Sequence, residues 1–143
     1  MKDFVIGNPV TGEVFPIRTP ISCHDSGVIY MVRCGKDTGA CARVGGPTYV
    51  GVESDKRPVQ ERAREHFGST IWPSHRDTDK PVGVHFRGPG HVPQRDLSFL
   101  PIEKVRSKDP FVQLARESFW ISSLGTLRKH DDDNVQFGLN IDP

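Results

Sequence analysis

The sequence lacks the features that mark membrane, secreted and strongly charged proteins. No stretch of its 143 residues approaches the roughly 18 consecutive apolar residues of a membrane-spanning helix, and the N-terminus has no apolar block of the secretory kind. The three cysteines are odd in number, which argues against a pure disulfide framework and leaves metal binding open. A net charge of +1 excludes a strong overall attraction to nucleic acid or to an anionic membrane. We therefore expect an intracellular protein, nuclear or cytoplasmic, with no membrane partner.

Charge is unevenly distributed along the chain. Residues 56–106 carry ten Lys/Arg and six Asp/Glu, a net charge of +4, whereas the rest of the chain is net negative. The length suits one domain rather than two independent cores. The middle of the chain is therefore the part expected to face an anion, although a solvated surface with random charge variation is an alternative.

The hydrophobic pattern predicts a small α/β fold. Short runs of β-forming residues, Pro at the first turn of each predicted helix and Gly at its end define the elements. The predicted strands are 4–6, 14–17, 28–32, 48–52 and 97–105, and the predicted helices are 58–68 and 110–124. We expect a three-stranded, mainly antiparallel sheet with flanking helices. Residues 1–26 form an N-terminal extension that folds as a hairpin, residues 27–143 form the main domain, and 35–47 and 69–96 are loops.

A carboxylate falls on an apolar stripe of the second predicted helix. Glu117 shares the helical spacing of Leu114, Ile121 and Leu124. An ionised carboxylate between such neighbours needs a cation, either a basic side chain or a metal ion. The alternative is that Phe111, Val112, Phe119 and Trp120 form the buried face and that Glu117 points to water.

Two thiols and two imidazoles make a candidate zinc set. Cys34 directly precedes the first predicted loop and Cys41 lies within it, and His85 and His91 flank a Gly-Pro-Gly turn that could bring them together. Bound Zn²⁺ would hold the long second loop in place. The gap between the two cysteines is longer than in common zinc motifs, and free thiols with surface histidines are the alternative. Cys23 and His24 are alternative ligands.

Several segments, in order, resemble the GIY-YIG nuclease superfamily. They are Val28–Tyr30, Tyr49–Gly51, Arg62–His66, Glu117 and Trp120-Ile121, and the resemblance extends from Gly27 to Asn140. It implies a GIY-YIG-like nuclease domain that hydrolyses DNA phosphodiester bonds.

A narrower resemblance is to the eukaryotic branch that includes the endonuclease domains of Penelope-like retroelements. The residues that carry it are His85–His91, Ile102–Lys104, Arg116–Ile121, Leu124–Leu127 and Gly138–Asn140. In that branch a Cys pair lies between the first two motifs and a His pair lies in the later loop, which supports the zinc set.

The resemblance implies a role for each matching residue. Glu117 would bind one divalent cation, Mg²⁺ or Mn²⁺, and Arg62 would stabilise the transition state. Tyr30, Tyr49 and His66 would surround the attacking water, with one of the three as general base. The sequence does not decide which one.

The chain departs from the family pattern after the second motif. The family usually has a threonine and a basic residue soon after the second motif, whereas the segment here is two residues longer and contains the acidic pair Glu53 and Asp55. Acidic groups near a phosphate site are unfavourable, so either they turn outward or activity is reduced. The alternative function is therefore a catalytically inactive, zinc-stabilised module that binds nucleic acid or a protein partner.

Basic side chains are expected to contact DNA phosphates. Such contacts position DNA without reading its sequence, and the small net charge predicts modest affinity. The candidates are Lys56, Arg57, Arg64, Arg87 and Arg95.

Overall fold

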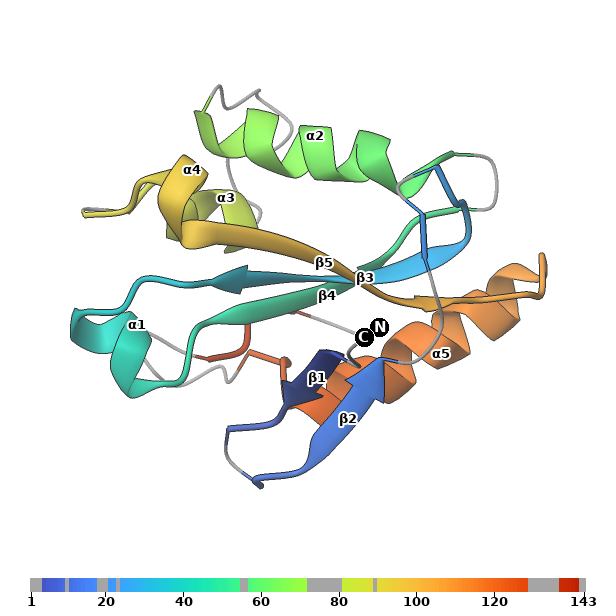
Figure 1. The fold of residues 1–143 in the computed structure, drawn as a ribbon, viewed down its shortest axis with the longest axis horizontal. Coiled ribbons are helices and arrows are strands. Elements are labelled where there is room, and N and C mark those ends of the chain that lie inside the picture. Colours follow the sequence, from blue (N-terminus) through green and yellow to red (C-terminus); the bar gives the residue numbers. More distant parts are fainter. Residues whose placement is uncertain are drawn as a thin grey trace.

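A three-stranded antiparallel sheet forms the centre of the molecule. In this computed structural model, which describes residues 4–9, 11–17, 21–22, 24–54, 57–71, 81–88, 90–128 and 137–141, strand β3 (Val28–Cys34) lies between β4 (Thr48–Val52) and β5 (Leu97–Lys104). Both neighbours pair with β3 in the antiparallel sense (Figure 1). The predicted mixed α/β class and the antiparallel three-stranded sheet are confirmed.

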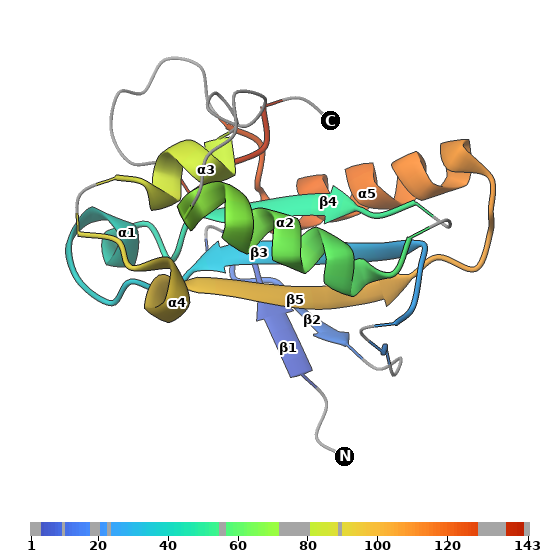
Figure 2. The ribbon, with the colours of Figure 1, turned by 90° about the horizontal axis from the view of Figure 1, so that it is seen from above.

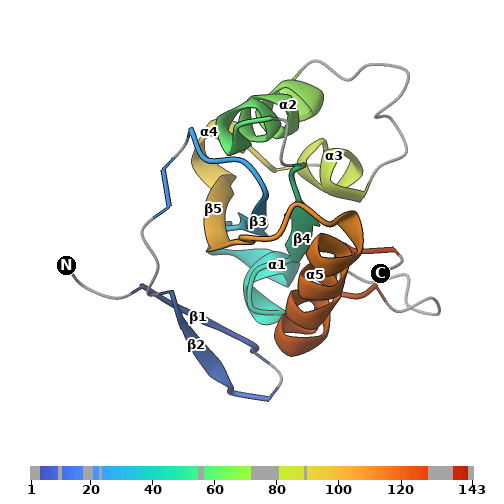
Figure 3. The same cartoon turned by 90° about the vertical axis from the view of Figure 1, so that its right-hand side faces the viewer.

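The central strand is buried on both faces. Tyr30 and Val32 pack on one face with Val59 of α2 (Val59–Ile71) and Phe86 of α3 (Pro81–Phe86). Ile29 and Met31 point to the other face and pack with α5 (Pro110–Leu124). Figures 1 and 3 show α2 and α3 on one side of the sheet and α5 on the other. The strict alternation along β3 therefore produces a layered molecule with two apolar cores.

The predicted N-terminal hairpin is confirmed. Strands β1 (Phe4–Gly7) and β2 (Val14–Ile17) pair in the antiparallel sense. The ring of Phe15 meets the ring of Trp120 on α5 edge-on, with centroids 5.6 Å apart. Asn8 Nδ2 donates a hydrogen bond to the carbonyl oxygen of Ser123, at 3.1 Å. The hairpin is thereby packed against the main domain.

The second predicted helix begins and ends as expected. The Asp109 carboxylate accepts a hydrogen bond from the backbone N–H of Phe111 at 2.9 Å, and Pro110 occupies the first helical position. Gly125 ends the helix in the left-handed conformation, with φ of 66°. These capping residues are local signals, which is why the sequence predicts both ends of α5.

The buried face of α5 differs from both predicted faces. Trp120, Ile121 and Leu124 are buried, but Leu114 is 51% exposed and Phe111 is 81% exposed. The expectation that Leu114 lies on the buried stripe is therefore wrong. The alternative, in which Phe111, Val112 and Phe119 form the buried face, is also wrong, because all three are exposed. The first turns of α5, which carry Phe111, Val112 and Leu114, extend beyond the end of β4 (Figure 2), which is why these three apolar side chains are exposed.

Three short helices lie in segments predicted as loops. They are α1 (Gly39–Arg43), α3 and α4 (Pro93–Asp96), whereas 72–80 lie outside the described residues. Helix α2 also continues past Gly68, where the sequence predicts its end, to Ile71. Helices of four to six residues carry no periodic hydrophobic signal and depend on tertiary packing. Among the described residues no helix is long and apolar enough to cross a membrane.

The C-terminal segment runs along the outer edge of β4. The side chain of Asn140 accepts a hydrogen bond from the Val50 N–H at 2.9 Å and donates one to the Val50 carbonyl at 2.8 Å. Its Oδ1 also accepts from the Thr126 hydroxyl, at 2.7 Å. The amide thus takes the place of a neighbouring strand and provides hydrogen-bond partners for the buried N–H and carbonyl groups of Val50.

Candidate functional site

A cleft of about 400 Å³ opens where β4 ends, between the start of α2 and the start of α5. The register aligns Val52, the last residue of β4, with Ile29 near the start of β3. Lining side chains that bear on its chemistry are Glu53, Arg57, Arg62 and Gln113.

The two candidate tyrosines meet across the sheet. Tyr30 on β3 is opposite Gly51 on β4, and a Cβ at position 51 would overlap the Tyr30 hydroxyl. The ring centroids of Tyr30 and Tyr49 are 6.3 Å apart. Phe99 of β5 stacks on Tyr30 from the other side, with centroids 4.7 Å apart. Gly51 therefore lets the Tyr30 phenol lie across β4, although neither tyrosine is among the residues that line the cleft.

Glu117 faces the end of β4 from α5. Its carboxylate is half-buried, and the backbone of Val52 forms a hydrogen bond with it. Burial raises the pKa of Glu117, while this hydrogen bond lowers it by a smaller amount. No ion pair to Glu117 occurs within the described part of the chain. The carboxylate is therefore one that a cation could neutralise, as the stripe on α5 predicts.

Arg62 completes a group of four predicted side chains. The charges of Arg62 and Glu117 both act on the hydroxyl groups of Tyr30 and Tyr49. Residues from β3, β4, α2 and α5 thus lie close together. The side chain of His66, the fifth predicted member, lies outside the described residues.

Both tyrosines hold their protons more tightly than a phenol in water. Burial raises the pKa of Tyr30 well above its ordinary value of 10.0, and the neighbouring Tyr49 adds to the increase. Burial also raises the pKa of Tyr49, with a further contribution from Glu117. In the metal-free protein both phenols are therefore hydrogen-bond donors at neutral pH rather than bases.

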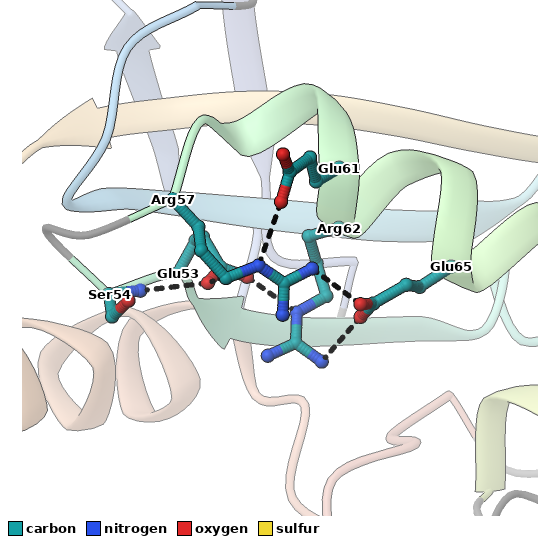
Figure 4. Close-up of polar contacts among 6 residues, drawn as sticks. All are labelled: Glu53, Ser54, Arg57, Glu61, Arg62 and Glu65. Atoms are coloured by element: carbon teal, nitrogen blue, oxygen red, sulfur yellow. Dashed lines mark hydrogen bonds and ion pairs between the residues drawn. The ribbon is translucent and has the colours of Figure 1, made fainter.

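Glu53 points inward, toward Arg62 (Figure 4). Its side chain is only 2% exposed, and its Oε2 accepts a hydrogen bond from Arg62 Nε at 2.7 Å. The alternative that Glu53 turns outward is therefore wrong; Asp55 lies outside the described residues. Removing one partner of a buried ion pair generally costs about 3–5 kcal/mol, because the other charge is left buried and unpaired.

More carboxylates than cations gather around this pair. Arg57 forms ion pairs with Glu61, at 3.0 Å, and with Glu65, and Arg62 Nη1 lies 3.2 Å from Glu65 (Figure 4). With Glu53, three carboxylates oppose two guanidinium groups, a net charge of −1 for the network. The network itself therefore does not attract phosphate by charge alone.

A second site lies at the opposite end of the sheet, where β3 ends. Cys34, Cys41, His85 and His91 each offer a ligand atom, and the four atoms lie within 4.8 Å of one another. Cys41 Sγ is 3.7 Å from His85 Nε2 and 3.5 Å from His91 Nε2. Tetrahedral Zn²⁺ with ordinary bond lengths separates a sulfur from a nitrogen by about 3.5 Å. The cluster could therefore hold a metal ion such as zinc.

The surroundings of this cluster suit neutral imidazole ligands. The Nδ1 atom of His91 lies 3.3 Å from the Gly88 carbonyl oxygen, which favours a proton on Nδ1 and a free lone pair on Nε2. Burial lowers the pKa of His85 to about 4. Of the alternative ligands, His24 is exposed and outside the cluster, and Cys23 lies outside the described residues.

The predicted phosphate-binding residues are scattered. Arg57 belongs to the carboxylate network, and Arg95 forms an ion pair with Asp96 at 2.8 Å. Arg64 is exposed on α2, and Arg87 is half-buried after α3. Lys56 lies outside the described residues. Only Arg57 of these lines the cleft.

Two residues that hold the site in place have no recognised role in the sequence. Asn140 fixes β4, and Glu103 of β5 accepts hydrogen bonds from Arg116 and Trp120 of α5. Both lie in segments that carry the family resemblance, which is the signal that could have found them.

Comparisons with protein-family models, with curated proteins and with solved structures find no match to this chain.

Proposed function

We propose that the chain is a divalent-cation-dependent endonuclease that hydrolyses DNA phosphodiester bonds at the end of β4, where Arg62 lines the cleft and interacts with the hydroxyl groups of Tyr30 and Tyr49. The convergence of Tyr30, Tyr49, Arg62 and Glu117 supports the proposal most strongly. Glu117 offers the oxygen ligand that Mg²⁺ or Mn²⁺ prefers, and within the described residues it has no ion-pair partner. A bound cation supplies Lewis-acid stabilisation of the charge on the phosphate.

Protein side chains bind the phosphate, orient the attacking water and accept its proton. Arg62 donates hydrogen bonds to the phosphoryl oxygens, where its permanent charge is most useful. Tyr30 and Tyr49, which keep their protons at neutral pH, orient the attacking water or the phosphate as hydrogen-bond donors. Of the three candidate bases we propose His66, because an imidazole can accept the proton of the water at neutral pH without the help of a metal ion, which a phenol would need.

Zinc at the Cys34, Cys41, His85 and His91 cluster has a structural role in this proposal. Four protein ligands would close its coordination sphere and leave no position for substrate. It would join the end of β3 to α1, α3 and the segment before α4.

The second candidate function is a zinc-stabilised module that binds nucleic acid or a protein partner without cleaving DNA. The ion pair between Glu53 and Arg62 favours it, because the guanidinium charge is already neutralised before a phosphate arrives. The net negative network beside the pair has the same effect.

Nicking of supercoiled plasmid DNA with Mg²⁺ or Mn²⁺ distinguishes the two functions. We expect wild-type protein to nick the plasmid and Glu117→Gln to lose at least about a hundredfold in rate, because the cation loses its ligand. Glu13→Gln, the same change on the exposed hairpin turn, is the control. Undiminished cleavage by Glu117→Gln would reject the site, and DNA binding without cleavage by wild-type protein would favour the module.

A further inference from the structure

We infer that Glu53 is a positioning residue that holds the Arg62 guanidinium in one orientation for the reaction, an inference that rests on the endonuclease function proposed above. Glu53 follows β4 directly, and its backbone N–H donates a hydrogen bond to the Val28 carbonyl at 2.9 Å. Its carboxylate therefore belongs to the rigid end of the sheet rather than to a mobile loop.

The contacts of Arg62 fix the plane of its guanidinium. Nε donates to Glu53 at 2.7 Å, and Nη1 lies 3.2 Å from Glu65 Oε2. The remaining terminal nitrogen, Nη2, has no partner in the described ranges. Figure 4 draws no contact between this nitrogen and the other five residues of the network. A planar fork held at two of its nitrogens has one orientation, so its free donors are presented in a constant direction.

Glu53 is itself fully engaged, which separates its role from that of a metal ligand. Its Oε1 accepts a hydrogen bond from the Ser54 N–H at 3.2 Å and lies 3.8 Å from Arg57 Nε. Both oxygens therefore already face protein donors. Glu117, in contrast, has no ion pair among the residues described, and it remains the carboxylate available to a cation.

Glu53 also differs from an inhibitory carboxylate that the substrate displaces. Because its side chain is 2% exposed, loss of Arg62 would leave a buried negative charge with the more distant Arg57 as its only cation among the described residues. A phosphate is therefore expected to add at the free side of Arg62 while Glu53 stays bound. Replacement of Glu53 should slow the reaction rather than release it.

Single-turnover nicking of DNA with Mg²⁺ tests this role, because the rate constant reports chemistry and the amplitude reports the fraction of active protein. We expect Glu53→Leu, which removes the acceptor, to lower the rate constant about ten- to a hundredfold at full amplitude. Glu53→Gln keeps an acceptor oxygen and should restore most of the rate. Glu13→Gln, on the exposed hairpin turn outside this network, should match wild type.

Three kinetic results would overturn the inference. They are a faster reaction in either Glu53 variant, equal losses in both variants, and a loss confined to the amplitude, which a purely structural role predicts.

A readout independent of catalysis separates this inference from the proposed function. In nuclear magnetic resonance spectra, the Arg62 Nε–H signal, assigned by its loss in Arg62→Lys, should exchange slowly in wild type and Glu53→Gln and rapidly in Glu53→Leu. Equal exchange rates in wild type and Glu53→Leu would overturn the positioning role. If wild-type protein cleaves no DNA, the proposed function fails and this measurement alone decides whether Glu53 holds Arg62.

Discussion

At the scale of single residues, the carboxylates of the fold differ in how their charge is balanced. Glu53 is paired with Arg62, and Glu103 is paired with Arg116. Glu117 is half-buried and receives only a backbone hydrogen bond from Val52, without an ion pair in the described parts of the chain. A folded protein retains such a charge at a cost to stability, and functional sites are where that cost is commonly found.

The stability cost of Glu117 can be measured. Burial raises its pKa above the ordinary 4.5, so the ionised carboxylate is less favourable in the folded chain than in the unfolded chain. This penalty applies above the raised pKa and disappears below the ordinary value, where both states are protonated. Glu117→Gln should therefore raise the melting temperature of the metal-free protein at pH 7, and calorimetry should show the difference shrinking toward pH 4.5.

The same variant tests the cation. Because a ligand that binds only the folded state stabilises it, Mg²⁺ should raise the melting temperature of wild-type protein. It should leave Glu117→Gln unchanged. An equal shift in both proteins would place the cation elsewhere.

Gly51 is a second position where the site tolerates only one side chain, the hydrogen atom of glycine. An added Cβ would overlap the Tyr30 hydroxyl, so Gly51→Ala should displace the phenol from its position across β4. We expect at least a tenfold loss of nicking rate, about the effect of a misplaced catalytic group. Gly7→Ala on β1, where a Cβ meets only an ordinary contact at 3.4 Å, is the control. Equal rates for the two variants would contradict a role for Tyr30 in the reaction.

At the scale of elements, the position of Glu117 depends on how α5 is attached to the sheet. Glu103 on β5 accepts a hydrogen bond from Arg116 Nε at 2.9 Å and one from Trp120 Nε1 at 3.1 Å. Both donors lie on α5, one residue before and three residues after Glu117. The three side chains therefore set the rotation of α5 about its axis, which directs Glu117 toward β4.

The contribution of Glu103 to the free energy of unfolding depends on pH in the opposite sense to that of Glu117. Burial acts to raise the pKa of Glu103, but the hydrogen bonds from Arg116 and Trp120 outweigh it and lower the pKa. The stabilisation is present above the ordinary pKa of 4.5 and is lost as the pH falls through the lowered value. Glu103→Gln should cost about 1–2 kcal/mol in urea unfolding at pH 7, and less as the solution becomes acidic. A difference that does not depend on pH would contradict this account.

Elements with local signals could be predicted, and those that depend on distant contacts could not. Helix α5 has a capping Asp109 and a terminal Gly125, and β3 has a continuous apolar run, so sequence reasoning finds both. Helix α1 has five residues and a single buried side chain, Cys41. Its formation depends on packing with residues more than 40 positions away, such as His85, which no local pattern reveals.

The candidate site shows the same limit. Spacing predicts that Glu117 needs a cation but cannot show whether a side chain or a metal ion supplies it. The inward direction of Glu53 depends on the meeting of β4 with α2, which adjacent residues do not encode.

At the scale of the whole molecule, two sites occupy opposite ends of one sheet. The Cys34, Cys41, His85 and His91 cluster lies where β3 ends, and the cleft lies where β4 ends. Since β3 and β4 are antiparallel, these are different ends of the sheet. Zinc would thus stabilise the fold without taking part in the chemistry.

Removal of zinc tests this separation. Purified protein should contain one zinc ion per chain, and chelation or Cys41→Ser should lower the melting temperature by about 10 °C, because α1 and α3 lose their connection. His24→Ala, at the exposed alternative ligand, should have no effect. Metal analysis without zinc, together with an unchanged melting temperature in chelator, would contradict a structural zinc site.

The central claim is that Glu117 binds the catalytic cation beside Tyr30, Tyr49 and Arg62. The most direct test is anomalous diffraction at the manganese edge from crystals of the full chain soaked in Mn²⁺. We predict a peak at the Glu117 carboxylate that is absent from Glu117→Gln crystals. A peak at Glu53 or Glu65 with none at Glu117, or the same peak in both crystals, would contradict the account.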